Sequence, residues 1–164
     1  MIKIKGFIIL FLFLLCFWIL LTGIKIEEII TGLFVAFIIS LILHKNSTLF
    51  SDIRLNPKSF WYGIVYLFVF LTELFKSNLD VAFRVLNPSL PINPGIVKVK
   101  TKLRSRLGRI ILANSITLTP GTLTVETKGE YFYIHWIDVG SDNIETATGQ
   151  IVSRFEKYLE VIFG

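Results

Sequence analysis

The sequence predicts an integral membrane protein in two parts: an N-terminal part of three short transmembrane helices, and a small α+β C-terminal domain with the element order β-α-β-β-α. The composition is 53% hydrophobic with a mean hydropathy of +0.68, which is high for a soluble domain of 164 residues. Apolar residues gather in three segments before residue 87, and a proline-rich stretch then separates them from shorter patterns. We therefore expect a membrane domain at 1–86, a linker at 87–95 and a folded domain at 96–164.

The first apolar segment is the strongest candidate for a membrane span. Phe7–Leu21 is 15 consecutive apolar residues within a charge-free window of 19 residues, close to the roughly 20 residues that a bilayer core requires. Lys3 and Lys5 before it also fit a secretory signal peptide, but no small-residue cleavage site follows the bulky run. We favour a retained helix at about 6–24.

The second and third segments predict helices at about 29–43 and 59–86. Their charge-free cores are 15 and 14 residues long, so both are short for a bilayer. A tight polar connection at Thr22–Glu28 makes the first two helices a hairpin. Pro57 suits the first turn of the third helix, and apolar residues continue at helical spacing to Leu86.

The distribution of basic residues predicts the topology. Residues 96–109 contain six Lys or Arg and no acid, and such an excess favours a cytoplasmic C-terminal domain. Three complete spans would then place the N-terminus outside, although Lys3 and Lys5 oppose that side. A hairpin that does not cross the bilayer completely stays open as an alternative.

The residues after 95 predict a small α+β domain. Val97, Val99 and Thr101 alternate with lysines, which indicates a strand with one basic face. The other predicted elements are a helix at 103–118, strands at 122–127 and 131–139, and a final helix capped by Asp142 or Asn143. Because so short a domain buries a marginal core, we expect it to dock against something larger.

Glu73 is the main candidate for ion chemistry. It lies late in an apolar helix, and ionisable groups within membranes are functional candidates by default. A carboxylate there could relay protons or bind a cation. Lys76 and Asp80 follow at helical spacing, so the favoured interpretation is an interfacial Glu73 paired with Lys76.

Other chemistry is weakly supported. The sequence lacks a phosphate-binding glycine loop, a nucleophile elbow and a cluster of metal ligands, so we expect no enzymatic activity, cofactor or metal site. The basic run at 98–109 could contact lipid headgroups or an acidic partner subunit. Nucleic acid is disfavoured, since no exposed aromatic pattern accompanies the charge.

Residues 110–125, IILANSITLTPGTLTV, form the most distinctive motif. Hydroxyl and amide side chains interleave with apolar ones, and Pro120-Gly121 divides a helical pattern from an alternating one. The segment therefore predicts a helix, a turn and a strand instead of a fourth span. Its hydroxyls have no neighbouring base, so we expect capping and turn roles.

The motif at 112–125 resembles the E-type subunit of the Mrp-type (Mnh, Sha) multisubunit Na+/H+ antiporters. The segments at 73–83, 86–99 and 133–139 agree with this resemblance in sequence and in order. It implies an accessory subunit of a cation:proton antiporter in the bacterial cell membrane, partnered by other subunits and by lipid, with a cytoplasmic C-terminal domain. It transfers no catalytic residue. The positions carried over as a structural family signature are Asn114, Thr117, Thr119, Pro120 and Gly121.

Three functions are therefore compared. The leading one is a non-catalytic subunit that supports assembly and activity of a sodium/proton antiporter. The first alternative places Glu73 directly in the ion path. The second is a membrane-tethered binding domain that recruits lipid or nucleic acid through its basic strand and helix.

Overall fold

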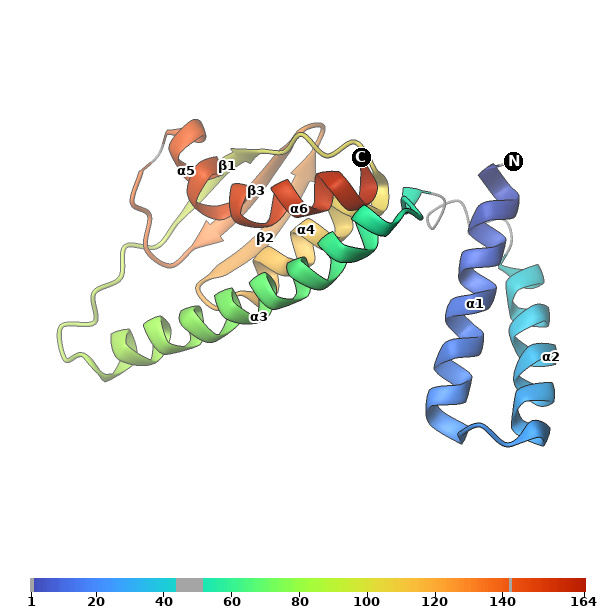
Figure 1. Ribbon diagram of the computed structural model, residues 1–164. Helices are drawn as coiled ribbons and strands as arrows, with labels where there is room; N and C mark the ends of the chain where they lie inside the picture. Colours follow the sequence, from blue (N-terminus) through green and yellow to red (C-terminus); the bar gives the residue numbers. More distant parts are fainter. Residues whose placement is uncertain (1, 44–51, 142) are drawn as a thin grey trace. The chain divides into compact units, whose positions relative to one another are not determined.

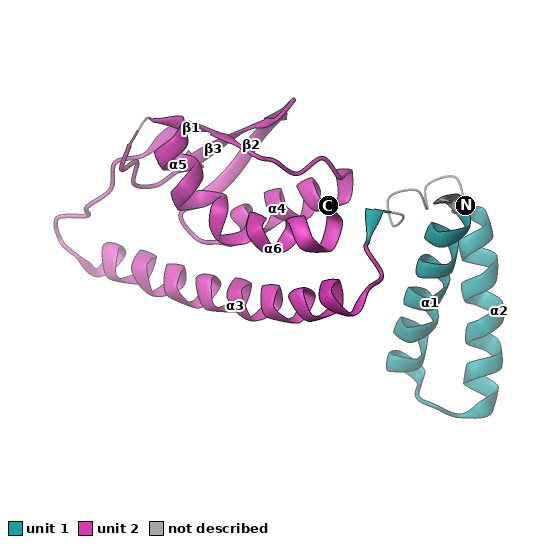
Figure 2. Cartoon of the chain, turned by 45° about the horizontal axis from the view of Figure 1, so that its top comes forward, with its two compact units in different colours: residues 1–53 teal, residues 54–164 magenta. Residues whose placement is uncertain are grey.

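The computed structural model describes residues 2–43, 52–141 and 143–164. The chain forms two compact units, residues 1–53 and residues 54–164, coloured separately in Figure 2. The boundary differs from the expected linker at 87–95, because the third helix belongs to the C-terminal unit. The prolines of 87–95 instead lie within that unit, between its long helix and its sheet.

The first unit is an antiparallel helical hairpin of α1 (Ile2–Thr22) and α2 (Ile26–Ile42). Gly23 turns the chain with a φ of 93°, which is favourable for glycine alone. Gly32 permits close packing, because a Cβ there would lie 2.5 Å from the Trp18 ring. The Trp18 indole N–H donates to the carbonyl of Glu28 at 2.9 Å. The predicted hairpin is confirmed, although its connection is only three residues long.

Within the described residues, one helix is long and apolar enough to cross a membrane, at Ile4–Thr22. The three expected transmembrane helices are therefore not all found. The second helix is 17 residues long and carries Glu27 and Glu28 in its first turn. The third helix carries charged residues along its second half, so its apolar run is too short.

The third helix, α3 (Pro57–Leu86), begins and ends close to the expected bounds. Pro57 occupies the first turn, and the Asn56 side chain accepts a hydrogen bond from the Ser59 N–H at 2.6 Å. One side of α3 packs along the rest of its unit. Figure 1 shows this helix lying lengthwise beneath α4 (Arg106–Leu118) and α6 (Ser153–Phe163).

The C-terminal residues form a three-stranded antiparallel sheet in the order β1-β3-β2. The strands are β1 (Gly95–Lys100), β2 (Thr122–Lys128) and β3 (Tyr131–Trp136). Val97 and Val99 are buried beside Ile134 and Phe132 of the central strand. The predicted β-α-β-β-α order is confirmed. A bulge between Thr124 and Glu126 was not anticipated by the alternating pattern.

The final helix is divided at Val152 into α5 (Ile144–Ile151) and α6. The Phe155 N–H bonds to the carbonyl of Val152, and the Ser153 hydroxyl donates to the carbonyl of Thr148. These local bonds interrupt the regular helical pattern that was predicted. The Asn143 side chain caps the helix, whereas Asp142 lies outside the described residues.

The hydrophobic core lies between the sheet and the helices α4, α5 and α6, with Phe132 and Phe155 as its largest members. Tyr66 and Phe70 of α3 pack against this core from the other side, and the rings of both lie within 6.5 Å of the Phe155 ring. The unit thus has three layers: sheet, short helices and α3. The expectation that the small domain docks against a larger element is met in part by α3.

Candidate functional site

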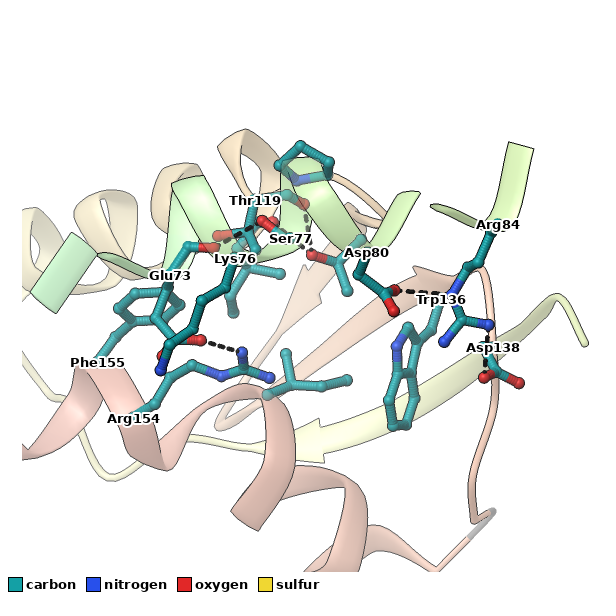
Figure 3. Close-up of a pocket in the computed structure, with 14 residues that line it drawn as sticks. Glu73, Lys76, Ser77, Asp80, Arg84, Thr119, Trp136, Asp138, Arg154 and Phe155 are labelled. Atoms are coloured by element: carbon teal, nitrogen blue, oxygen red, sulfur yellow. Dashed lines mark hydrogen bonds and ion pairs between the residues drawn. The ribbon is translucent and has the colours of Figure 1, made fainter. Parts of the chain in front are cut away.

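A cavity of about 280 Å³ lies where α3 meets the short helices and the sheet. Glu73, Lys76 and Asp80 line it from α3, while Thr119 and Pro120 reach it from the turn between α4 and β2 (Figure 3). The sequence had suggested the first group as an ion path or an interfacial group, and the second as part of a structural signature. The fold brings these two groups together, so the cavity is the candidate functional site.

Glu73 is held by two cations. Its carboxylate accepts a hydrogen bond from the Arg154 guanidinium at 2.6 Å and lies 3.7 Å from the Lys76 ammonium group. The Glu73 side chain is 21% exposed and that of Lys76 68%, so Lys76 is the solvated partner. The expected pairing with Lys76 is confirmed, but the shorter contact is with Arg154 of α6.

A second ion network closes the other end of the cavity. Arg84 bonds to Asp80 one turn earlier at 2.7 Å and to Asp138 after β3 at 2.8 Å. These two hydrogen bonds raise the pKa of the Arg84 guanidinium. Arg84 also donates to the carbonyl of Pro91, which ties the end of α3 to the proline-rich segment.

The charges that line the cavity balance. Three carboxylates, of Glu73, Asp80 and Asp138, face three cations, of Lys76, Arg84 and Arg154, and each carboxylate lies in an ion pair with a residue of the chain itself. A cation that entered would compete with arginines already bound in charge-assisted hydrogen bonds. The arrangement therefore suits fastening of α3 better than capture of a mobile ion.

The signature residues lie in two places: at the turn beside the cavity, and on the exposed surface of α4. Thr119 is buried and donates to the carbonyl of Ser115 at 2.7 Å, and Pro120 follows at the cavity wall. Gly121 has a φ of 91°, and its carbonyl accepts from the Ile137 N–H at 2.8 Å. Thr117 and Asn114 are exposed on α4, away from the cavity.

Two threonine hydroxyls of the motif bond to the backbone. Thr122 donates to the carbonyls of Ile116 and Thr119, and Thr124 donates to that of Ala113. These bonds hold the end of α4 against β2, which confirms the expected capping and turn roles. Asn114 instead lines a separate surface hollow with Arg104, Arg106 and Arg109.

Tyr66 links α3 directly to the motif through a short hydrogen bond between its hydroxyl and that of Ser115. Burial raises the pKa of the Tyr66 phenol, and the bond to Ser115 partly opposes that effect. The Ser115 hydroxyl also donates to the carbonyl of Ile111 at 2.7 Å. Ser115 therefore joins the helix that carries the motif to α3.

Sequence reasoning missed Arg154, Asp138 and Tyr66 as partners. Arg154 lies 81 residues from Glu73 and Asp138 lies 54 from Arg84, so helical spacing cannot associate them. Among the described residues, no group of three or more His, Cys, Asp or Glu side chains is placed to hold a metal ion.

Comparison with known proteins places the chain among antiporter subunits. A family model described as a Na+/H+ ion antiporter subunit matches residues 11–162. The E1-type subunit of the Na+/H+ antiporter of Staphylococcus haemolyticus is 35% identical over 92% of this chain and 93% of that protein. The E-type subunit of the Na+/H+ antiporter of Alkalihalophilus pseudofirmus is 41% identical over 59% of this chain, and the match spans only 61% of that protein.

A solved structure resembles the chain over nearly its whole length. A chain in the structure of the membrane-bound sulfane sulfur reductase, an archaeal respiratory membrane complex, has a TM-score of 0.87 and is 41% identical. The match covers 97% of this chain and 99% of that one. The same fold therefore occurs in a respiratory complex.

Proposed function

The chain belongs to the family of Na+/H+ antiporter subunits, and we propose that it is an accessory, non-catalytic subunit that supports the assembly and activity of a multisubunit cation/proton antiporter. The observation that carries the accessory role is the pairing of Glu73 with Arg154 at 2.6 Å. This contact uses the candidate ion-path carboxylate to hold α3 on its own unit.

The proposed location is a bacterial cell membrane, with the C-terminal unit in the cytoplasm. In this arrangement α1 crosses the bilayer and α2, which spans about 26 Å, returns to the first side. Lys3, Lys5 and the basic run at 98–109 then share the cytoplasmic side, as the positive-inside tendency favours. With this topology, the N-terminal lysines and the basic C-terminal domain both favour the same side of the membrane.

Purification from native membranes in mild detergent tests the accessory role. We expect the tagged chain to co-purify with hydrophobic subunits of the antiporter, and its deletion to lower both complex yield and sodium-dependent proton flux. The proposal would be contradicted if the tagged chain purified alone and if membranes from the deletion strain kept full antiporter activity. That result would favour the membrane-tethered binding domain.

Glu73→Gln separates the accessory role from direct ion transfer. The amide keeps the shape of the side chain but cannot carry a proton, so flux per assembled complex should match the wild type even where yield falls. Asp80→Asn is the matched control, because Asp80 is paired in the same cavity. Loss of flux in Glu73→Gln alone, at wild-type yield, would assign Glu73 to the ion path.

One observation favours a second type of complex that contains this chain as a subunit. The chain of the archaeal respiratory complex is 41% identical over 97% of this protein, compared with 35% over 92% for the staphylococcal antiporter subunit. The second candidate function is therefore a subunit of a membrane respiratory complex. Mass spectrometry of the co-purifying subunits distinguishes the two hosts, since a reductase subunit among them would identify the respiratory one.

A further inference from the structure

The side of α3 that faces away from its own unit is mainly apolar along the helix. Its members recur at spacings of three, four and seven residues, and Phe68, Phe75 and Phe83 are each exposed by about two thirds. An apolar stripe of this length is unfavourable in water and marks contact with lipid or protein. We call this stripe the outer face; it includes Trp61, Phe68, Leu71, Phe75, Leu79 and Phe83.

Two polar side chains on the outer face bond within α3 itself. The Thr72 hydroxyl donates to the carbonyl of Phe68 at 2.8 Å, and the Asn78 amide donates to that of Leu74 at 2.7 Å. These bonds make the outer face compatible with a hydrocarbon phase, which offers polar groups no other partners.

A groove beside the outer face adds positive charge. It has a volume of about 520 Å³ and lies between α3 and α6, with Trp61, Val65 and Phe68 among its apolar lining residues. Lys76, Arg154 and Lys157 also line it, against the single carboxylate of Glu73. An apolar floor with an excess of cations matches the acyl chain and phosphate of an anionic phospholipid. Long basic side chains can also reach the headgroups while their stems cover apolar surface.

We propose that the outer face and this groove lie in the surface of the bilayer, with anionic phospholipid against Lys76 and Lys157. A candidate membrane span lies in the same chain, at Ile4–Thr22. Amphipathic helices with one apolar face lie in the bilayer surface. The proposal does not depend on which complex carries the chain.

Spin-label accessibility in nanodiscs tests this surface on the full chain. With Cys16 replaced by serine, single labels are placed at Phe68→Cys and Phe75→Cys, and at Thr127→Cys as an exposed control on β2. Relaxation by oxygen reports lipid, and relaxation by a water-soluble nickel chelate reports solvent. We expect oxygen to dominate at 68 and 75 and nickel at 127, with the oxygen-to-nickel ratios differing at least fivefold.

Two other results would overturn the proposal. Nickel-dominated relaxation at 68 and 75 would show a water-exposed face, and low accessibility to both reagents would show a protein-covered one. The charge is tested with the label at 68 in nanodiscs of phosphatidylcholine with and without phosphatidylglycerol. Lys157→Glu should lower the ratio at least twofold only when phosphatidylglycerol is present, whereas Lys128→Glu should leave it unchanged. If Lys157→Glu and Lys128→Glu had equal effects, the groove would not bind anionic headgroups through Lys157, and that part of the proposal would be wrong.

Discussion

α1 and α3 are both long helices with apolar cores, yet they serve different purposes. α1 carries its only charges, Lys3 and Lys5, in the first turn and is long and apolar enough to cross a membrane. α3 is longer at 30 residues, but one of its sides binds the rest of its unit through residues such as Tyr66, Phe70 and Glu73. The two helices differ in the length of their apolar run and in the side on which the polar groups lie.

The length of the contact is the reason why we do not propose α3 as a span. Ser59 at one end donates to the carbonyl of Val161, and Arg84 at the other end binds Asp138. These residues are separated by roughly 38 Å of helix, more than the roughly 30 Å of a hydrocarbon core. No stretch of α3 between them is free to be surrounded by lipid on all sides.

Phe155→Ala should weaken the attachment of α3 most. The Phe155 ring is buried against Tyr66 and Phe70, and loss of such a ring lowers the free energy of unfolding by about 3–5 kcal/mol. Denaturant titration of the full chain in detergent measures the change, followed by Trp136 fluorescence in a background with Trp18 and Trp61 replaced by phenylalanine. Leu123→Ala, at a half-exposed position on β2, should cost about 0.5 kcal/mol or less. Equal losses would mean that α3 is not held through Phe155.

Gly121→Ala should have the next largest effect, by disturbing the turn that faces α3. A Cβ at this position would lie 2.9 Å from Ile137 and 3.8 Å from Val81, at a φ of 91°. Strain and overlap together should lower the free energy of unfolding by about 2–4 kcal/mol.

Gly129→Ala is the matched control, because its φ is 56° and its Cβ would meet nothing within 4 Å. It should cost only about 1–2 kcal/mol. If the two variants unfold at the same denaturant concentration, the close approach at Gly121 has no energetic role.

Tyr66→Phe should have the smallest effect at neutral pH. It removes the hydrogen bond to Ser115, which contributes about 0.5–1.5 kcal/mol. Its pH dependence is more specific: the folded-state pKa of Tyr66 is raised, so its contribution is complete below the unfolded pKa of about 10 and is lost as pH rises further.

The pH dependence of unfolding distinguishes Tyr66 from the other tyrosines. Between pH 10 and 11 the wild type should lose more stability than Tyr66→Phe, measured as the shift in melting temperature in detergent. Parallel losses in both proteins would show that Tyr66 ionises equally easily in the folded and unfolded states.

Local elements were largely predictable from the sequence, and long-range contacts were not. Pro57 marked the start of α3, alternating Val97 and Val99 marked β1, and Pro120-Gly121 marked the turn. From the sequence, Glu73 was interpreted as an interfacial residue paired with Lys76. Its partner Arg154, and the partner Asp138 of Arg84, come much later in the chain. Periodicity shows that a face is polar, but it does not identify what covers that face.

The candidate site shows the same division. Spacing predicted the pair of Glu73 with Lys76, which is present, and the pair of Asp80 with Arg84 has the same helical spacing. The cavity itself arises because the turn after α4 packs against α3, and the motif gave no sign of that contact. Family resemblance marked Thr119 and Pro120, and the fold places both at the wall of the cavity.

Cysteine labelling from the two sides of the membrane tests most directly whether α1 and α3 differ as described. In a Cys16→Ser background, single cysteines replace Leu55 before α3 and Ser89 after it, both exposed, and Lys25 in the hairpin turn. With a membrane-impermeant maleimide, we predict that positions 55 and 89 react from the same side and position 25 from the opposite side. Reaction of positions 55 and 89 from opposite sides would show that α3 crosses the bilayer, and would contradict the account.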